Sequence, residues 1–213
     1  MNPAGLTIVR STDRYVVIDK PAGLLSVPGK GEGNRDCAAA RVREAFPGCS
    51  GPLVVHRLDM DTSGLLVFGL DAAAQRELSG QFEARTVDKK YVALVLGAPP
   101  AETGEIDVPI RADITNRPVQ IVDYEQGRQS RTLWRVLSLE ADRTRLELVP
   151  LTGRTHQLRV HLAQAGLPIL GDVLYGDQPR TAESADRLML HASELEFVEP
   201  GGVRVRVVSR PPF

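Results

Sequence analysis

Two short apolar runs separated by a polar loop are the feature that most constrains how this chain can fold. Leu53–Val55 and Leu65–Phe68 are too short for helices, so both are predicted to be buried strands. The segment between them, residues 56–64, reads His-Arg-Leu-Asp-Met-Asp-Thr-Ser-Gly. Because strands flank it on both sides, we expect a tight, exposed connection that a packed core holds rigid.

The residue types in this loop fit two interpretations. In the first, Asp59 and Asp61 are turn formers and Arg57 pairs with one of them on the surface. In the second, the loop carries catalytic groups. A hydrolase that uses Asp59 and Asp61 as paired carboxylates is the weaker alternative.

Composition limits the class of protein. The 213 residues are 42% hydrophobic, which predicts one compact domain over residues 1–213, arranged in two lobes. The net charge of -1 gives no global positive field, so any RNA site must be a local basic patch. No apolar run reaches membrane-spanning length, and a cytoplasmic location is expected. Cys37 and Cys49 lack a metal-binding spacing and are predicted to be ordinary reduced thiols.

Periodicity elsewhere predicts an α+β chain. A polar, glycine-rich segment at 30–34 is predicted to be mobile. Asp71 is predicted to cap a helix that ends near Ala84. The remaining predictions are strands at 6–9, 15–18, 89–96, 104–110, 130–139, 144–149, 188–192 and 203–207, and a helix at 36–46.

A second polar stretch, residues 151–166, is predicted to start a helix capped by Thr152 or Thr155 and ended by Gly166. Arg154 then lies at a helix N-terminus, where a cation is unfavourable. Either a carboxylate or phosphate is its partner, or it is a surface arginine without one.

The histidines do not predict a metal site. His156 and His161 are five residues apart, so on a helix they point about 140° away from each other. Two ligands on one helix face need a spacing of four. His191 is predicted to be a hydrogen-bonded core or edge histidine rather than a catalyst.

Three strings together resemble the RluA family of pseudouridine synthases. They are Lys-Pro-Ala-Gly-Leu at 20–24, the loop string at 56–64 continued by Leu-Leu, and Gly-Arg-Thr-His-Gln-Leu-Arg at 153–159. They occur in the family's order, and the resemblance covers nearly the whole chain. It implies the pseudouridine synthase fold, which is a mixed, largely antiparallel sheet with flanking helices and loops, in two lobes around a central active-site cleft.

The resemblance also implies an activity, the isomerisation of uridine to pseudouridine in RNA without a cofactor. Asp59 is then the nucleophile and Arg154 its partner. Tyr91 is expected to stack on the flipped base, although its strand setting alone favours a packed aromatic. Arg57 is expected to brace the space that the flipped nucleotide leaves. Further RNA contacts are predicted for His56, Thr62, Arg117, Thr155, His156 and Leu158.

Other features resemble the dual-specificity members of this family, which modify both 23S ribosomal RNA and the transfer-RNA anticodon loop. These are Val-Pro-Gly at 27–29, Asn-Arg-Pro at 116–118 and the short length, with no room before Leu6 for an S4-type RNA-binding domain. The predicted partners are stem-loops of 23S rRNA and tRNA, with no membrane and no obligate protein partner, so that a monomer is expected. The alternative is a noncatalytic RNA-binding or ribosome-assembly protein that uses the same cleft.

Overall fold

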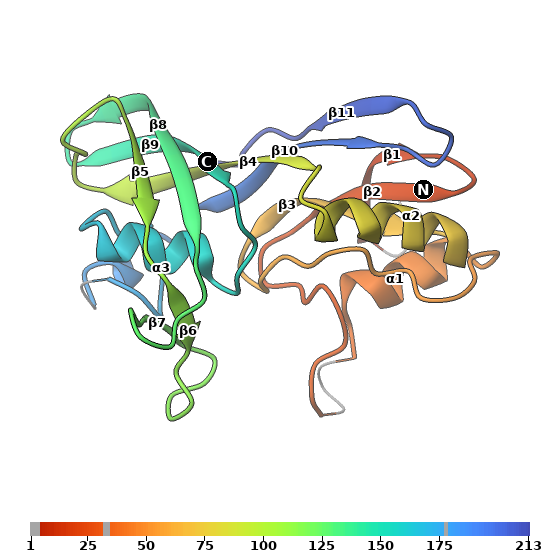
Figure 1. Cartoon of the computed structure of the whole chain (residues 1–213), viewed down its shortest axis with the longest axis horizontal. Coiled ribbons are helices and arrows are strands. Elements are labelled where there is room, and N and C mark those ends of the chain that lie inside the picture. The colour runs from red at the N-terminus through yellow and green to blue at the C-terminus, as the bar shows by residue number, and fades with distance from the viewer. Residues whose placement is uncertain (1–4, 32–34, 177–178) are drawn as a thin grey trace. The chain divides into compact units, whose positions relative to one another are not determined.

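The computed structural model describes residues 5–31, 35–176 and 179–213. Contacts divide the chain into two compact units (Figure 1). Unit 1 comprises the described residues up to Lys89 together with His191–Pro212, and unit 2 comprises Lys90–Leu190 together with Phe213. Part of the predicted mobile segment, residues 32–34, lies outside the described residues.

Unit 1 is built on a mixed sheet, as the α+β prediction required. Its strands follow the order β1-β2-β3-β10-β11, and only β3 and β10 run parallel. The strands are β1 (Thr7–Ser11), β2 (Tyr15–Lys20), β3 (Ser63–Gly69), β10 (Leu190–Val198) and β11 (Arg204–Val208). Every residue of β3 is buried, which explains its continuous apolar sequence.

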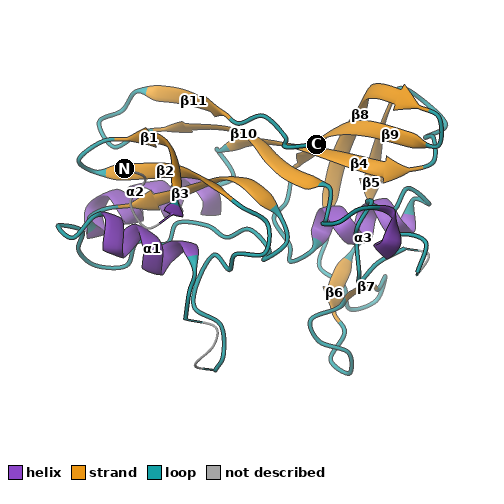
Figure 2. Ribbon diagram, turned by 180° about the vertical axis from the view of Figure 1, so that it is seen from behind, coloured by secondary structure: helices purple, strands orange, loops and turns teal. Residues whose placement is uncertain are grey.

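Two helices lie on one side of the β2 and β3 strands (Figure 2). Helix α1 (Ala38–Ala45) begins after Cys37, whose Sγ accepts a hydrogen bond from the Ala40 amide at 3.4 Å. Helix α2 (Ala72–Glu83) begins after Asp71, whose carboxylate accepts from the Ala74 amide at 2.8 Å. The predicted Asp71 cap is therefore confirmed. Cys37 and Cys49 are both free thiols.

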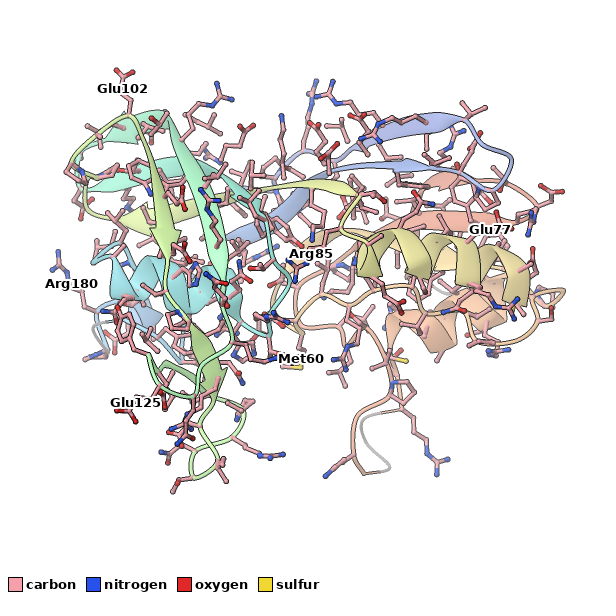
Figure 3. The ribbon with its side chains drawn as sticks, viewed as in Figure 1. Met60, Glu77, Arg85, Glu102, Glu125 and Arg180 are labelled. Carbon is pink, nitrogen blue, oxygen red and sulfur yellow. The ribbon has the colours of Figure 1, made fainter. Side chains whose placement is uncertain are left out.

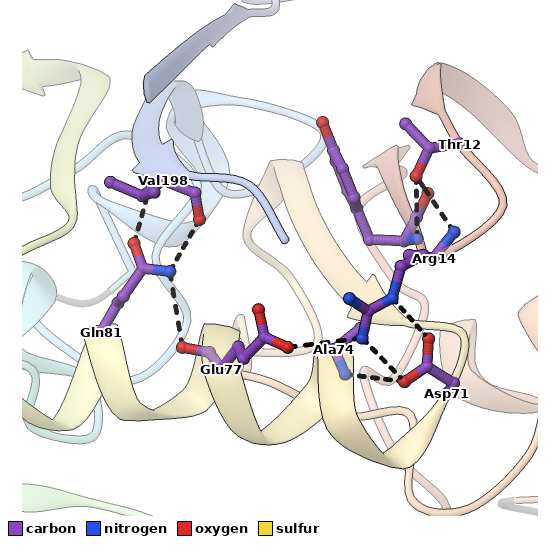
Figure 4. Close-up of polar contacts among 8 residues, drawn as sticks. Thr12, Arg14, Asp71, Ala74, Glu77, Gln81 and Val198 are labelled. Carbon is purple, nitrogen blue, oxygen red and sulfur yellow. Dashed lines mark hydrogen bonds and ion pairs between the residues drawn. The ribbon is translucent and has the colours of Figure 1, made fainter. Parts of the chain in front are cut away.

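Side chains fasten both ends of α2 to the strands (Figure 4). Arg14 donates to the two carboxylate oxygens of Asp71, at 3.0 and 3.2 Å. Near the other end, Gln81 donates to the carbonyl of Val198 at 2.7 Å and accepts from its amide at 2.8 Å. The helix is thus fixed in rotation, and Leu78 is held in the core of unit 1.

In unit 2, four strands pair antiparallel in the order β4-β9-β8-β5. A short hairpin of β6 and β7 stands apart from it, and α3 contributes Leu158 and Leu162 to the core. None of the described helices is long and apolar enough to cross a bilayer. The elements are β4 (Asp88–Leu96), β5 (Thr103–Asp107), β6 (Ile110–Ala112), β7 (Gln120–Val122), β8 (Arg131–Glu140), β9 (Arg143–Pro150), α3 (Gln157–Gln164) and a 3-10 turn at Ala182–Ser184.

Two predicted strands are wrong. Residues 53–55 form only an isolated bridge between Val54 and Phe68, because the ring of His56 accepts the Val67 amide hydrogen bond that a continuing strand would need. The predicted strand over 104–110 is split, with β5 ending at Asp107 and β6 beginning at Ile110. Pro109 lies at the break and has no amide hydrogen to donate.

Candidate active site

The backbone on both sides of Asp59 is fixed by side chains of an earlier segment. The hydroxyl of Ser26 donates to the carbonyl of Leu58 at 2.6 Å, and the same oxygen accepts from the Leu58 amide at 3.0 Å. On the other side, the Lys20 ammonium donates to the carbonyl of Met60 at 2.9 Å. Asp59 is therefore presented by a loop whose neighbouring peptides have little freedom.

Lys20 explains why the segment 20–24 matters. Its side chain is completely buried, and its ammonium also donates to the carbonyls of Pro21 at 2.9 Å and Leu24 at 2.7 Å. A buried ammonium needs such acceptors, because an unsatisfied buried charge is strongly unfavourable. Lys20 thus joins the segment that follows it to the loop of Asp59.

The predicted description of residues 56–64 as an exposed connection is wrong in part. Leu58, Thr62 and Ser63 are buried, whereas Arg57 and Met60 are exposed. The buried side chains of the loop pack against the rest of unit 1. A loop that contributes to the core in this way cannot lie free in solvent. Figure 3 labels Met60, which is 46% exposed and lies next to Asp59 in the chain.

His56 anchors the start of this loop. Its ring stacks on Phe82 with centroids 4.2 Å apart and planes 14° apart, and its Nε2 accepts from the Val67 amide at 3.2 Å. Burial, and then the charge of Lys89, lower the pKa of His56 to about 3. The ring is therefore neutral near pH 7, with its proton on Nδ1 because Nε2 is an acceptor.

A chain of hydrogen bonds fixes the end of the loop. Ser209 donates to Asp19, so its oxygen can accept from Nε2–H of His191 at 3.1 Å. The Nδ1 of His191 then accepts from the hydroxyl of Ser63 at 2.8 Å. His191 is 1% exposed, which confirms the predicted hydrogen-bonded core histidine.

Gly64 follows Ser63 at a position that excludes a side chain. Its φ is 112°, and a Cβ there would lie 2.3 Å from the carbonyl oxygen of Ala192. These two residues are register partners in the parallel pair of β3 and β10. The Ser-Gly part of the loop string is thus explained by the close approach of two strands.

The predicted start of α3 is wrong. The helix begins at Gln157, its N-cap is His156 in the left-handed conformation with a φ of 53°, and no side chain caps it. Thr152 does not cap because its hydroxyl accepts from the Arg131 amide and bonds to Oε1 of Gln157. Thr155 is exposed.

Arg154 consequently precedes the helix by three residues, outside its first turn. The unfavourable dipole interaction that the sequence suggested therefore does not apply. Its backbone is nevertheless fixed, since the amide of Arg154 donates to Oε1 of Gln157 at 3.1 Å. The side chain of Arg154 is partly buried.

Arg159, the last residue of the string at 153–159, is not an exposed helix arginine. It is 2% exposed and makes a bidentate ion pair with Asp172, at 2.8 and 2.7 Å. Asp172 also accepts from the amides of Leu174 and Tyr175, so the pair is well satisfied. Sequence periodicity missed this pair because its partners come together only through the turn that follows α3.

Tyr175 links this pair to the residues before the helix. Its ring lies under the guanidinium of Arg159, with 5.1 Å from Cζ to the ring centroid. Its hydroxyl accepts from the Gln120 amide at 2.8 Å and lies 2.7 Å from Nδ1 of His156. The segment around His156 is thus connected to the β6–β7 hairpin of unit 2.

Tyr91 lies on β4 opposite Leu148 of β9 and packs, partly buried, against the core of unit 2. Arg57, Arg117 and Thr155 are exposed. Thr62 and Leu158 are only 2% and 7% exposed, so packing accounts for both. Their contact with RNA stays a prediction that this burial does not favour.

His156 and His161, whose spacing in the sequence argues against a shared metal ion, both make hydrogen bonds. His161 is buried, with Nδ1 3.0 Å from the hydroxyl of Thr132 and Nε2 3.2 Å from the carbonyl of Val108. Burial lowers the pKa of His161. Within the described ranges, no group of three or more His, Cys, Asp or Glu side chains is arranged to hold a metal ion.

Comparison with known proteins places these features in a family. The family model for RNA pseudouridylate synthase matches residues 14–164. The dual-specificity RNA pseudouridine synthase RluA of Escherichia coli (strain K12) is 45% identical over 196 residues, covering 92% of this chain and 88% of that protein. The protein of the same name from Yersinia pestis is 46% identical over 195 residues, covering 91% and 93%.

A solved structure agrees. Human RNA pseudouridylate synthase domain containing 1 has a TM-score of 0.83 and 30% identity, and the match covers 100% of this chain and 86% of that one. The matched residues 14–164 include the loop of Asp59, the strand of Tyr91 and the segment of Arg154. This chain therefore belongs to the RNA pseudouridylate synthase family.

Proposed function

We propose that this enzyme converts single uridines to pseudouridine in stem-loops of 23S ribosomal RNA and of the transfer-RNA anticodon arm, in the cytoplasm. Membership of the family makes it an RNA pseudouridine synthase. The observation that carries the residue assignment is the fixed backbone on both sides of Asp59. The names of its relatives describe them as dual-specificity enzymes, which supports two classes of RNA substrate.

The reaction explains why so few groups are needed. The bond from N1 of uracil to C1′ of the ribose breaks, the uracil rotates, and C5 bonds to C1′. A proton leaves C5, and N1 ends with a hydrogen, so atoms and electrons balance within one nucleotide. No oxidant, reductant or group donor takes part, and we propose that no cofactor is used.

Asp59 would act as an ionised carboxylate. It can add to C1′ of the sugar, add to C6 of the base or remove the C2′ proton, and each route needs the ionised form. Fixing the peptides at Leu58 and Met60 limits the positions that the carboxylate can occupy. Such positioning accelerates a step by removing orientational freedom before the reaction begins.

Three other residues have proposed roles. Arg154 would keep the carboxylate of Asp59 ionised, because an opposite charge offsets the desolvation that favours the protonated acid. Tyr91 would stack on the uracil and help to remove the C5 proton. Because the target atoms are inaccessible in a stacked RNA, the nucleotide must be flipped out, and exposed Arg57 would brace the space it leaves.

The test is incubation of uridine-labelled stem-loop RNA with the protein, in the presence of a chelator and without cofactors. The wild type should form pseudouridine, and Asp59→Asn should bind RNA and form none, because an amide is neither nucleophilic nor basic. Asp61→Asn, two residues further along the same loop, is the matched control and should stay active.

Other products would contradict the proposal. Comparable pseudouridine from Asp59→Asn would remove the nucleophile assignment. Release of free uracil would indicate a hydrolase, and RNA binding without any product would indicate the noncatalytic alternative. Loss of activity on chelation, with recovery on adding zinc or magnesium to prefolded RNA, would overturn the cofactor-free mechanism.

A further inference from the structure

Gln157, the first residue of α3, binds both backbone polar groups of Arg154. The Arg154 amide donates to Oε1 of Gln157 at 3.1 Å, and the Gln157 amide donates to the Arg154 carbonyl at 3.2 Å. The same Oε1 accepts from the hydroxyl of Thr152 at 2.7 Å. The peptide groups on both sides of the Arg154 Cα are thus fixed by one residue, which restricts the direction in which the Arg154 side chain leaves the backbone.

The other end of the Gln157 side chain is bound to β8. Its Nε2 donates to the carbonyl of Arg131 at 3.0 Å and to the hydroxyl oxygen of Thr132 at 3.0 Å. Because a backbone amide can only donate and a carbonyl can only accept, the carboxamide has a single satisfied orientation. Gln157 is 4% exposed, and both hydrogens of Nε2 and both acceptor sites of Oε1 are used. Its side chain therefore has no polar capacity left for a ligand.

A core histidine determines which way the Thr132 hydroxyl points. Burial lowers the pKa of His161, so its ring is neutral near pH 7. Nε2 of His161 lies 3.2 Å from the carbonyl of Val108, which can only accept, so this nitrogen carries the ring proton. Nδ1 then accepts from the Thr132 hydroxyl at 3.0 Å, and the oxygen of Thr132 remains an acceptor for Gln157. The direction of every hydrogen bond from Val108 to Arg154 is therefore determined.

This network contributes geometric precision more than stability. Thr132 and His161 are completely buried, where apolar groups of similar shape would fill the same space. Replacing buried hydrogen-bonded partners with apolar groups of the same shape changes stability little. A fully satisfied buried network, by contrast, fixes one arrangement. What is fixed here is the backbone of Arg154, at one end of the network.

We propose that Gln157 is a positioning residue for the reaction, which acts through the backbone of Arg154. Thr132 and His161 orient its amide. This inference rests on the proposed function, in which Arg154 keeps the carboxylate of Asp59 ionised. An arginine that is held in place before the RNA binds has little orientational freedom to lose when the reaction begins. Loss of Gln157 should therefore slow the reaction while leaving RNA binding intact.

Gln157→Met tests this role. Methionine has a similar length and volume but cannot accept from the Arg154 amide. The single-turnover rate of pseudouridine formation on a stem-loop, at saturating protein, should fall about 10- to 100-fold, as expected for a misplaced reacting group. The dissociation constant of the RNA should stay unchanged. A wild-type rate in the folded variant would overturn the proposal, and so would weaker RNA binding with an unchanged rate.

Two variants of the same helix serve as controls. Gln164→Met makes the same substitution at the last residue of α3, which is exposed, and should react like the wild type. Leu162→Ala removes a completely buried side chain from the core of unit 2, and it should lower the melting temperature. Its rate per folded molecule should nevertheless be unchanged. An equal fall in the rate of folded Leu162→Ala would attribute the Gln157→Met result to lost stability and overturn the positioning role.

Rescue by a conservative change tests the orientation of the amide. Thr132→Val keeps the branched shape but removes the hydroxyl that accepts from Gln157, whereas Thr132→Ser keeps a hydroxyl. The rate should fall in Thr132→Val, by less than in Gln157→Met because Oε1 can still accept from the Arg154 amide. Thr132→Ser should react like the wild type. Equal rates in the two variants of Thr132 would overturn the role assigned to Thr132 and His161.

Hydrogen exchange without RNA separates this inference from the proposed function. In Gln157→Met the backbone amides of residues 152–156 should exchange faster than in the wild type and in Gln164→Met. Unchanged exchange there would overturn the positioning role whatever the activity. A wild type that forms no pseudouridine would remove the proposed function alone. An active wild type with an equally active and equally protected Gln157→Met would remove the positioning role alone.

Discussion

Arg154 and Arg159 belong to one sequence motif but have different surroundings. Arg159 is buried in a bidentate pair with Asp172, and removing one partner of such a pair leaves an uncompensated charge in the core. Arg159→Ala should therefore lower the free energy of unfolding by about 3 kcal/mol or more. Arg154→Ala should lose single-turnover activity in a protein that stays folded. Urea unfolding and rate measurements on both variants provide the check.

A double variant serves as the control for this stability prediction. Arg159→Met with Asp172→Leu removes both charges together, so it should recover most of the stability that Arg159→Ala loses. If Arg159→Ala unfolds at the same urea concentration as the wild type, the buried pair contributes nothing. Equal activity losses in folded Arg154→Ala and Arg159→Ala would contradict the special role of Arg154.

At the scale of elements, the loop of Asp59 is joined to α2 by the stack of His56 on Phe82. Because the pKa of His56 is about 3 in the folded protein and near 6.5 when unfolded, only the unfolded state gains this proton between those values. The contribution of neutral His56 to the free energy of unfolding is fully present above pH 6.5 and decreases as the pH falls toward 3. Between pH 7 and pH 5 the loss should be up to about 2 kcal/mol.

Urea unfolding at pH 7 and pH 5 measures this difference. His56→Gln has no titrating ring but keeps an oxygen that can accept from the Val67 amide, so it should lose less stability than the wild type over this range. The comparison between the two proteins cancels the contributions of other titrating groups. Parallel losses in both would show that His56 is not held neutral by burial.

Sequence patterns correctly predicted the elements that depend only on residues close together in the chain. The Asp71 cap and the strands β8 and β9 follow from capping and alternation, and they were predicted correctly. The missing strand at 53–55 has a distant cause, because the side chain of His56 takes the amide of Val67. The start of α3 was misplaced because Thr152 bonds to Arg131 and Gln157 instead of capping.

The candidate site was predictable to a similar extent. The loop string made Asp59 a candidate, but periodicity could not show that Lys20 and Ser26 fix its neighbours from a segment more than thirty residues earlier. Nor could it find the pair of Arg159 and Asp172, which depends on the turn after α3. Contacts between distant segments carry no local signature, so they emerge only from the folded structure.

For the whole molecule, the charge balance limits how RNA can be recognised. The net charge is -1, and many exposed arginines are already paired with carboxylates. Each neutralised phosphate contributes to affinity through the release of counterions, so a small number of available cations means a small phosphate footprint. Exposed or half-buried arginines in such pairs include Arg10, Arg14, Arg41, Arg111, Arg131, Arg135, Arg204 and Arg206.

Selectivity must then come from features that a short RNA already carries, namely the shape of a loop, unstacked bases and the energy needed to flip one nucleotide. We expect an anticodon-type stem-loop and a 23S rRNA stem-loop each to be modified at one uridine, and assembled ribosomal subunits to be poor substrates. Single-turnover pseudouridine formation on each hairpin, on full-length RNA and on intact subunits measures this. Activity confined to assembled subunits would contradict local recognition, and activity on one hairpin alone would remove the dual specificity while leaving the enzyme class unchanged.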